Sequence, residues 1–267
     1  MRKQISSTQN PYIKELFQIK EKSRIRKKTK TFLIEGLREI SLALKGGYEV
    51  HTLLVDFSII DESTLNSLLK STDLSIEVIE ITHQIHQKLA TRTTTEGILA
   101  VAKTKDLLLK TLKFKTKNPL ILVAEAPEKP GNIGALLRTA DAAGIDAVLI
   151  ANPKTDMYNQ NIIRSSVGCL FTTAIATGST SEIIAFLKAH KINIFGAALT
   201  ASVAYQTKDY TEPSAIVVGT EATGLTDEWL QNTTSNIIIP MRGAIDSMNV
   251  SVSAAIILFE AVRQRQL

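Results

Sequence analysis

The clearest hydrophobic pattern in the chain lies between residues 120 and 144. An unbroken apolar run at 120–124 is followed by Pro127 and Pro130 and then by apolar residues at helical spacing. This order predicts a buried strand, a tight loop and a helix that ends at Gly144. The stripe that should pack on a sheet comprises Ile133, Leu136, Leu137, Ala140 and Gly144.

The opposite face of this helix carries one long side chain, Arg138, among the small residues Gly134, Ala135 and Ala142. Small neighbours leave room for another backbone or a ligand to approach the guanidinium. For Arg138 alone, a solvated arginine on an amphipathic helix is the simpler interpretation. Two segments further along the chain favour a functional one.

Apolar runs and helical patterns alternate through the rest of this region. Predicted strands lie at 147–151, 171–175, 192–198, 215–219 and 237–239, and predicted helices at 159–166, 181–190, 227–231 and from 250 onward. Continuous apolar strands between helices are typical of a mostly parallel sheet with helices on both faces. Such sheets bind ligands in loops at the carboxyl ends of their strands.

The first hundred residues alternate in the same way and predict a small α/β unit. Strands are expected at 32–34, 50–57, 76–81 and 98–102, and helices at 12–20, 35–44, 64–70 and 82–89. Residues 103–117 carry six lysines and are interpreted as mixed helix and linker. We therefore expect one domain at 1–102, a linker at 103–118 and a second domain at 119–267.

Positive charge is concentrated in the first part of the chain. The net charge is +5, but residues 1–118 hold 21 Lys+Arg and 13 Asp+Glu, whereas residues 119–267 hold 10 and 13. This asymmetry indicates a polyanionic partner. One set of candidate phosphate contacts lies in a dense basic run and comprises Arg24, Arg26, Lys27 and Lys28; this run could also be a solvated helix end. Another candidate is Arg92, which lies in a hydroxyl-rich loop at 91–95 that could be a simple turn.

Several classes of protein are disfavoured by composition. No apolar run approaches the roughly 18 residues of a membrane span, and the first 14 residues lack the apolar stretch of a secretory signal. The single cysteine, Cys169, excludes an internal disulfide, and with four scattered histidines it gives no zinc-ligand spacing. The expectation is a cytoplasmic protein without a metal.

Three segments at predicted strand ends carry the candidate chemistry. They are Asn-Ile-Gly at 132–134 with Arg138, Gly-Thr-Glu-Ala-Thr-Gly-Leu at 219–225, and Ile-Pro-Met-Arg-Gly at 239–243 followed by Ser-Met-Asn-Val-Ser at 247–251. Singly, each has a structural explanation, because glycines form turns and Ser247 or Asn249 could cap the last helix. Neither a dinucleotide glycine fingerprint nor a Walker lysine is present.

Together and in this order, the segments resemble the motifs of the SpoU-type RNA 2′-O-ribose methyltransferases of the SPOUT superfamily. Residues 164–168 look like a further family segment, and residues 5–100 are similar to the family's substrate-binding domain, a small α/β fold like that of a ribosomal protein. Met248 stands where leucine is commoner and Ser253 where alanine is commoner.

The resemblance implies methyl transfer from S-adenosyl-L-methionine to a ribose 2′-hydroxyl of RNA, with 23S ribosomal RNA favoured over transfer RNA. It also implies a C-terminal trefoil knot, which is rare among proteins, and a homodimer whose sites borrow residues from the partner. Arg138 would hold the developing oxyanion and the adjacent phosphate, or activate the hydroxyl. The other implied catalytic residues are Asn132, Glu221, Ser247 and Asn249, and the implied cofactor contacts are Gly219, Ile239 and Met248, with Ala198 and Leu199 lining the same pocket.

Two other functions compete with this interpretation. A non-catalytic RNA-binding protein would need only the basic N-terminal half, but the intact Arg138, Glu221 and Asn249 argue against it. An unrelated nucleotide-dependent α/β enzyme, such as a dehydrogenase, is disfavoured by the missing glycine fingerprint.

Overall fold

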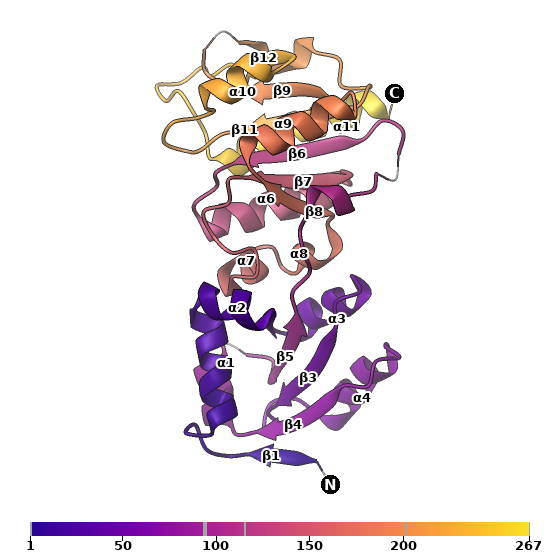
Figure 1. Cartoon of the computed structure of the whole chain (residues 1–267), viewed down its shortest axis with the longest axis vertical. Helices are drawn as coiled ribbons and strands as arrows, with labels where there is room; N and C mark the ends of the chain where they lie inside the picture. Colours follow the sequence, from indigo (N-terminus) through magenta and orange to yellow (C-terminus); the bar gives the residue numbers. More distant parts are fainter. Residues whose placement is uncertain (1, 93–94, 115, 201, 267) are drawn as a thin grey trace. The chain divides into compact units, whose positions relative to one another are not determined.

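The structure, a computed structural model, describes residues 2–92, 95–114, 116–200 and 202–266 (Figure 1). The chain divides into two compact units. Unit 1 comprises Met1–Asp106 and Asp156–Thr172, and unit 2 comprises Leu107–Thr155 and Thr173–Leu267. A short segment from the second half of the chain, 156–172, therefore belongs to the same unit as the N-terminal residues.

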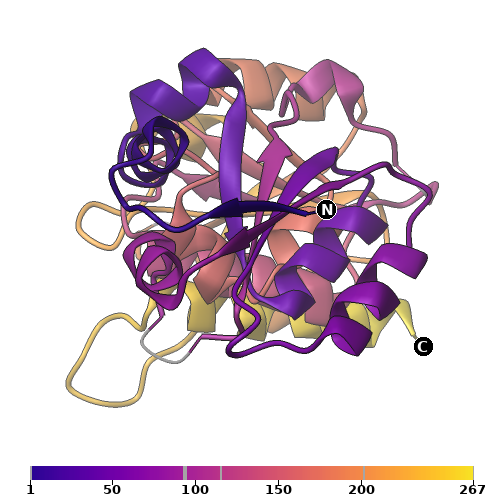
Figure 2. The ribbon, with the colours of Figure 1, turned by 90° about the horizontal axis from the view of Figure 1, so that it is seen from below.

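Unit 1 is built on a five-stranded mixed sheet in the order β1-β4-β3-β5-β2. The strands are β1 (Lys3–Ile5), β2 (Thr31–Glu35), β3 (Val50–Val55), β4 (Glu77–Ile81) and β5 (Ile98–Lys103). Strands β1, β4 and β3 are parallel, whereas β5 runs antiparallel to both β3 and β2. Strand β1 is the edge strand in this order, and it lies in dark indigo at the front of Figure 2.

Helices cover the sheet of unit 1. They are α1 (Pro11–Glu21), α2 (Ser23–Thr29), α3 (Leu37–Lys45), α4 (Glu62–Lys70), α5 (His83–Leu89), α7 (Gln160–Ser165) and α8 (Cys169–Thr172). Helix α1 begins one residue before the predicted range, because the Asn10 side chain accepts from the Tyr12 N–H and Pro11 occupies the first turn. Helix α3 begins two residues later than predicted, because Glu35 ends β2 and its carboxylate accepts from the N–H groups of Thr91 and Arg92.

One predicted strand is wrong. Residues 171 and 172 belong to helix α8, and the strand begins only at Ile175. The backbone turns at Val167 and Gly168, which have φ values of 53° and 84°, and Phe171 is buried beside the aromatic ring of Tyr48 at a centroid distance of 5.1 Å. An apolar run of this length does not distinguish a strand from a buried helical turn.

Unit 2 is built on a seven-stranded sheet in the order β10-β12-β9-β11-β6-β7-β8. The strands are β6 (Leu120–Glu125), β7 (Ala147–Ala151), β8 (Ile175–Gly178), β9 (Asn193–Ala197), β10 (Val203–Ala204), β11 (Ser214–Val218) and β12 (Ser235–Ile238). All neighbouring strands are parallel, which confirms the predicted sheet.

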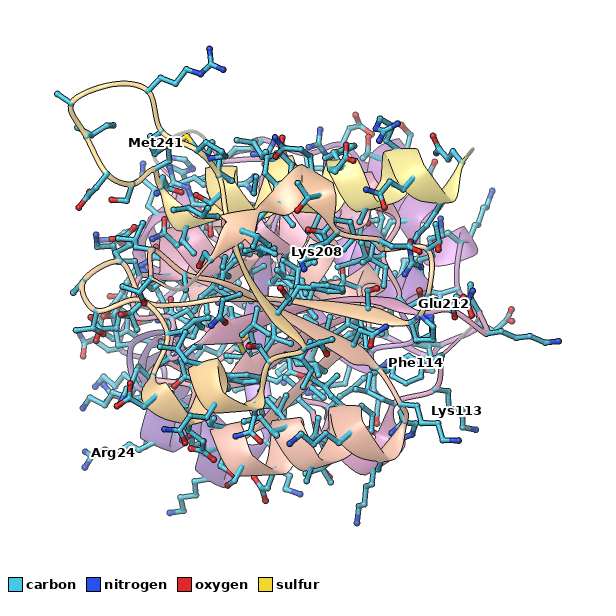
Figure 3. All side chains as sticks on the ribbon, turned by 90° about the horizontal axis from the view of Figure 1, so that it is seen from above. Arg24, Lys113, Phe114, Lys208, Glu212 and Met241 are labelled. Carbon is cyan, nitrogen blue, oxygen red and sulfur yellow. The ribbon has the colours of Figure 1, made fainter. Side chains whose placement is uncertain are left out.

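Helices lie on both faces of this sheet. They are α6 (Pro130–Ala143), α9 (Thr180–Ala189), α10 (Asp227–Asn232) and α11 (Val250–Arg265), with short 3-10 turns η1 (Leu109–Thr111) and η2 (Tyr205–Thr207). Figure 3 shows α11, in yellow, on one side of the sheet and α9 and α10 on the other. Helix α6 packs against α11 and ends at Gly144, which adopts the left-handed conformation with φ 63°. Gly134, expected on its exposed face, is buried.

The strand register brings the motif loops to one edge of the sheet. Val218 at the end of β11 pairs with Ala124 of β6 on one side and with Ala197 of β9 on the other. Ile237 of β12 also pairs with Ala197. Because carboxyl ends of parallel strands meet at the same edge, the segments that follow these four strands lie next to one another.

Candidate active site

Side chains from all three motif segments meet in a polar cluster of unit 2, which comprises Lys129, Asn132, Glu221 and Asn249. The Asn132 Nδ2 donates to Glu221 Oε1 at 2.5 Å. The Asn249 Nδ2 donates to Asn132 Oδ1 at 3.2 Å and to Glu221 Oε1 at 3.5 Å. Residues 132, 221 and 249 are thus joined in space although they are far apart in sequence.

Lys129 is a member of the polar cluster that the sequence motifs do not identify. Its ammonium group pairs with Glu221 Oε2, and its side chain is 71% exposed. The hydrogen bond from Lys129, followed by that from Asn132, lowers the pKa of the Glu221 carboxyl. A sequence signal was available, because Pro130 favours the first position of a helix and so places Lys129 at the N-cap of α6, where it makes no capping bond. A cation at the N-terminus of a helix opposes the helix dipole, so this position is not chosen for helix stability.

Asn249 both caps helix α11 and belongs to the polar cluster. It is the N-cap of α11, and its Oδ1 accepts from the Ser251 N–H at 2.9 Å and from the Ser251 hydroxyl at 2.7 Å. Capping uses the amide oxygen and leaves the amide Nδ2 to face Asn132 and Glu221. The cap therefore fixes the orientation of the amide within the polar cluster.

A cavity of about 810 Å³ lies at the same edge of the sheet. This volume falls within the range of about 300–1,000 Å³ that small-molecule sites occupy. Its walls come from the segments after β9, β11 and β12 and from the start of α11. The lining includes all five predicted cofactor residues and three predicted catalytic residues, namely Ala198, Leu199, Gly219, Ile239, Met248, Glu221, Ser247 and Asn249.

The loop at 219–225 approaches itself so closely that its wall of the cavity is largely backbone. A Cβ at Gly219 would lie 2.1 Å from the carbonyl carbon of Gly224, and Thr220 and Gly224 form a β-bridge. Backbone N–H and C=O groups beside the apolar side chains of Leu199 and Met248 fit a ligand with a flat heteroaromatic ring and polar edges. The cavity therefore suits an adenosine-bearing cofactor.

Two predicted catalytic residues lie apart from the polar cluster. Arg138 is exposed on α6 and forms no hydrogen bond or ion pair with any residue that the structure describes. It lies six positions after Asn132 on the helix, about 9 Å further along the axis and on another face. The Ser247 hydroxyl donates to Asp246 Oδ1 at 3.1 Å and lines the cavity without joining the polar cluster.

The predicted RNA contacts have different surroundings in unit 1. Arg24, Lys27 and Lys28 are exposed on α2, and Arg24, labelled in Figure 3, points into solvent. Arg26 is instead buried, with its Nε donating to Asp156 Oδ2 at 2.5 Å and its Nη1 donating to two backbone carbonyls at 2.8 Å. Burial removes Arg26 from the surface that RNA reaches, which corrects its expected role.

Arg92 is largely committed to the protein. Its guanidinium pairs with the buried carboxylate of Glu39 and lies 3.7 Å from Glu96, and its side chain is 24% exposed. Residues 93 and 94 of the predicted hydroxyl-rich loop lie outside the described residues. An arginine held in this way can position a loop more readily than it can move to a phosphate.

Among the described residues, no group of three or more His, Cys, Asp or Glu side chains is arranged to hold a metal ion. Within the same part of the chain, none of the helices has the length and apolar character needed to cross a bilayer.

Comparisons with known proteins agree with this architecture. The model of the SpoU rRNA Methylase family matches residues 119–259, and that of the MRM3-like substrate binding domain matches residues 10–100. The chain is 32% identical to the 23S rRNA (guanosine(2553)-2′-O)-methyltransferase RlmP of Bacillus subtilis (strain 168), over 96% of this chain and 98% of that protein.

Two further proteins help to distinguish substrates and cofactors. The tRNA (guanosine(18)-2′-O)-methyltransferase of Escherichia coli (strain K12) is 38% identical, over 55% of this chain and 64% of its own. The crystal structure of the SpoU methyltransferase AviRb from Streptomyces viridochromogenes in complex with the cofactor AdoMet superposes with a TM-score of 0.88 at 27% identity, covering 97% of this chain and 99% of that one.

Proposed function

Because the chain belongs to the SpoU rRNA methylase family, we propose that it transfers a methyl group from S-adenosyl-L-methionine to a ribose 2′-hydroxyl of RNA. The observation that carries this proposal is the polar cluster beside the cavity. A site for a small cofactor and a set of side chains that can orient a sugar lie at the same edge of one sheet.

The cavity residues are the ones that would hold the cofactor. Backbone groups of Gly219, Ile239 and Met248 would bind the adenine, and Ala198 and Leu199 would line its face. When bound, S-adenosyl-L-methionine supplies an electrophilic methyl group on a sulfonium. The protein's own task is to place a ribose oxygen in line with that methyl group and to stabilise the oxygen as it loses its proton.

The polar cluster and Arg138 divide that task. The amides of Asn132 and Asn249 and the carboxylate of Glu221 form a connected set of donors and acceptors suited to ribose hydroxyls. Arg138 offers a planar, permanently charged fork that can hold an oxyanion and a neighbouring phosphate. A guanidinium remains protonated, so the proton of the hydroxyl passes to another acceptor, such as that phosphate.

A homodimer explains why Arg138 lies apart from the polar cluster of its own chain. Helix α11, which packs beside α6, exposes an apolar stripe that includes Val252 and Phe259, each 47% exposed, with Ala255 and Ile256 between them. Burial of this stripe against a second copy would give α11 the apolar surroundings that its composition favours. In such a dimer each polar cluster would receive Arg138 from the other copy. We likewise propose that the C-terminal part of the chain forms the trefoil knot that the family resemblance implies.

Ribosomal RNA is the proposed substrate, in the cytoplasm. The relative that acts on 23S rRNA matches almost the whole chain, whereas the relative that acts on tRNA matches 55% of it. In unit 1, the exposed Arg24, Lys27 and Lys28 are suited to phosphate contact.

The proposal is tested by incubating the purified protein with S-adenosyl-L-methionine and total RNA from cells that lack it, and then mapping the new 2′-O-methyl groups. We expect one strong site in 23S ribosomal RNA and none with the Asn132→Ala variant. Methylation of transfer RNA alone would overturn the substrate assignment. RNA binding without cofactor binding in isothermal titration would establish the non-catalytic alternative.

A further inference from the structure

A buried carboxylate in unit 2 has no cationic partner among the described residues. Glu125, the last residue of β6, is 3% exposed. Its oxygens accept from Trp229 Nε1 at 2.5 Å, from the Thr180 hydroxyl at 2.8 Å and from Asn152 Nδ2 at 3.1 Å. Three neutral donors, from α9, α10 and the loop after β7, compensate for the loss of water around this group.

The backbone around this carboxylate is also unusual. Ala126, directly after β6, and Asn152, directly after β7, both adopt left-handed conformations, with φ values of 40° and 46°. The Asn152 side chain donates to Glu125 and, at 2.8 Å, to the Thr180 hydroxyl. Non-glycine residues keep such conformations only where their surroundings enforce them, and they are common at functional sites.

Glu125 lies directly next to the wall of the cavity. The pairing of Val218 with Ala124 places Gly219, the first residue of the 219–225 loop, beside Glu125 on the neighbouring strand. Adjacent strands are about 4.8 Å apart, so the backbone of Glu125 lies beside the base of the loop that lines the cavity. Glu125 itself does not line the cavity.

Helix α10 continues this loop, and Trp229 is its main anchor, beside a partly buried Leu230 and a bond from Lys188 to Asn232. It has six residues, its N-cap Thr226 makes no side-chain capping bond, and its one buried residue is Trp229. A helix of this length is not stable without tertiary contacts. Leu225 and Leu230, which line the cavity, pack in the same hydrophobic core as the Trp229 ring, so a shift of that ring should move both.

We propose that Glu125 is a positioning residue for the cofactor site, which it shapes by fixing Trp229 and, through it, α10 and the 219–225 loop. The identity of the cofactor rests on the proposed function. Glu221, which lies in the same 219–225 loop, is held by Lys129 and Asn132 and not by the Glu125–Trp229 bond. Loss of the Glu125–Trp229 bond should therefore weaken cofactor binding and leave the polar cluster in place.

The first test is steady-state methylation by the full-length Trp229→Phe variant, which keeps an aromatic ring but removes the N–H donor together with part of the buried ring volume. We expect the KM for S-adenosyl-L-methionine to rise about tenfold, with kcat at saturating cofactor and the KM for RNA within about twofold of wild type. Glu125→Gln, which keeps the shape but turns an amide donor toward the other donors, should raise the cofactor KM further.

Leu187→Ala is the matched control for simple destabilisation. Leu187 is fully buried in the same hydrophobic core, has no side-chain hydrogen-bonding group and does not line the cavity. We expect it to lower the melting temperature while leaving the cofactor KM unchanged. An unchanged cofactor KM in Trp229→Phe, or an equal rise in Leu187→Ala, would overturn the proposal.

A binding measurement distinguishes failure of the positioning role from failure of the proposed function. It can also be applied to a variant that is too unstable for turnover assays. Trp229 is the only tryptophan in the chain, so its fluorescence reports on α10 directly. Wild-type fluorescence should change on titration with S-adenosyl-L-methionine, and the Glu125→Gln titration should show a weaker apparent affinity. If wild type binds no cofactor, the proposed function fails. If wild type and Glu125→Gln bind it equally, only the positioning role fails.

Discussion

Arg138 and Asn132 belong to one helix but contribute to the site in different ways. Asn132 is held by Glu221 and Asn249 within its own chain, whereas Arg138 has no partner among the described residues. A free guanidinium that is kept on an otherwise well-packed helix is available for a ligand. Its planar fork, and not only its charge, should be what the reaction needs.

Replacement of Arg138 by lysine should therefore reduce kcat by about 100-fold, a loss of the size seen when one donor to a developing oxyanion is removed. Arg138 does not line the cavity, so the affinity for S-adenosyl-L-methionine should be unchanged. Single-turnover methylation and isothermal titration measure the two quantities. A rate near that of wild type would exclude a role for the guanidinium geometry.

The Lys129–Glu221 pair predicts a pH effect. The hydrogen bond from Lys129 is the largest cause of the lowered pKa of Glu221. A lowered pKa means that Glu221 stays ionised, and the polar cluster intact, down to a lower pH than an ordinary glutamate would allow. In Lys129→Gln the acidic limb of the kcat/KM profile should therefore move to higher pH, toward the ordinary glutamate value of about 4.3.

Lys154→Gln provides the control for this experiment, because Lys154 is an exposed lysine of unit 2 outside the polar cluster and carries the same charge change. Its profile should coincide with that of wild type. Coincident limbs in wild type and Lys129→Gln would show that Glu221 does not govern the acidic limb.

Some residues of the site can be predicted from the sequence and others cannot. Motif order placed Asn132, Glu221 and Asn249 at strand ends, and parallel-strand geometry explains why they meet. Arg26 was misjudged because a charge pattern does not reveal that Asp156, far along the chain, lies close enough to bury it. Lys129 was missed because it belongs to no motif, although its misfit as a helix cap was visible.

At the scale of elements, the tight turn at 219–225 is the feature on which the cavity depends most directly. Gly219→Ala would place a methyl group 2.1 Å from backbone, which no side-chain movement can relieve. We expect the variant to lose S-adenosyl-L-methionine affinity by more than about tenfold, as judged by isothermal titration.

Gly243→Ala serves as the matched control, since a Cβ there meets no atom within 4 Å. It should bind the cofactor as wild type does. Equal affinity in both alanine variants would mean that the turn can open without harm to the cavity.

Hydrophobic periodicity predicted most elements, because helices and buried strands of an α/β protein each leave a distinct spacing of apolar residues. It failed where an element is short or lies at an edge. The strands β1 and β10 have three and two residues, which is too few to show a period. The residues of α8 were predicted as a strand because a short apolar run that includes Phe171 fits a strand and a buried helical turn equally well.

At the scale of the whole molecule, the proposed dimer has a decisive test in subunit mixing. Arg138→Lys and Asn132→Ala should each be inactive alone. If each site combines the polar cluster of one copy with Arg138 of the other, a mixed dimer contains one complete site. Equal mixing should then recover about a quarter of wild-type activity, because half of the dimers are mixed and each has one working site.

Differently tagged copies produced in the same cell allow the mixed dimer to be purified and assayed. Activity no higher than that of the parents would show that Arg138 serves the site of its own chain. Size-exclusion chromatography with light scattering verifies that both variants remain dimers, so that a lack of recovery is not a failure to assemble.

The segment at 156–172 has a consequence for anyone who wishes to divide this protein. It leaves the large sheet after β7 and returns before β8, yet its aromatic residues Tyr158 and Phe171 pack with Phe32 and Tyr48. A fragment that starts after residue 106 would keep Tyr158 and Phe171 but lose the rings that cover them. It would therefore expose an apolar surface to water. Transplanting the basic N-terminal region onto a related enzyme therefore requires moving two stretches of chain together.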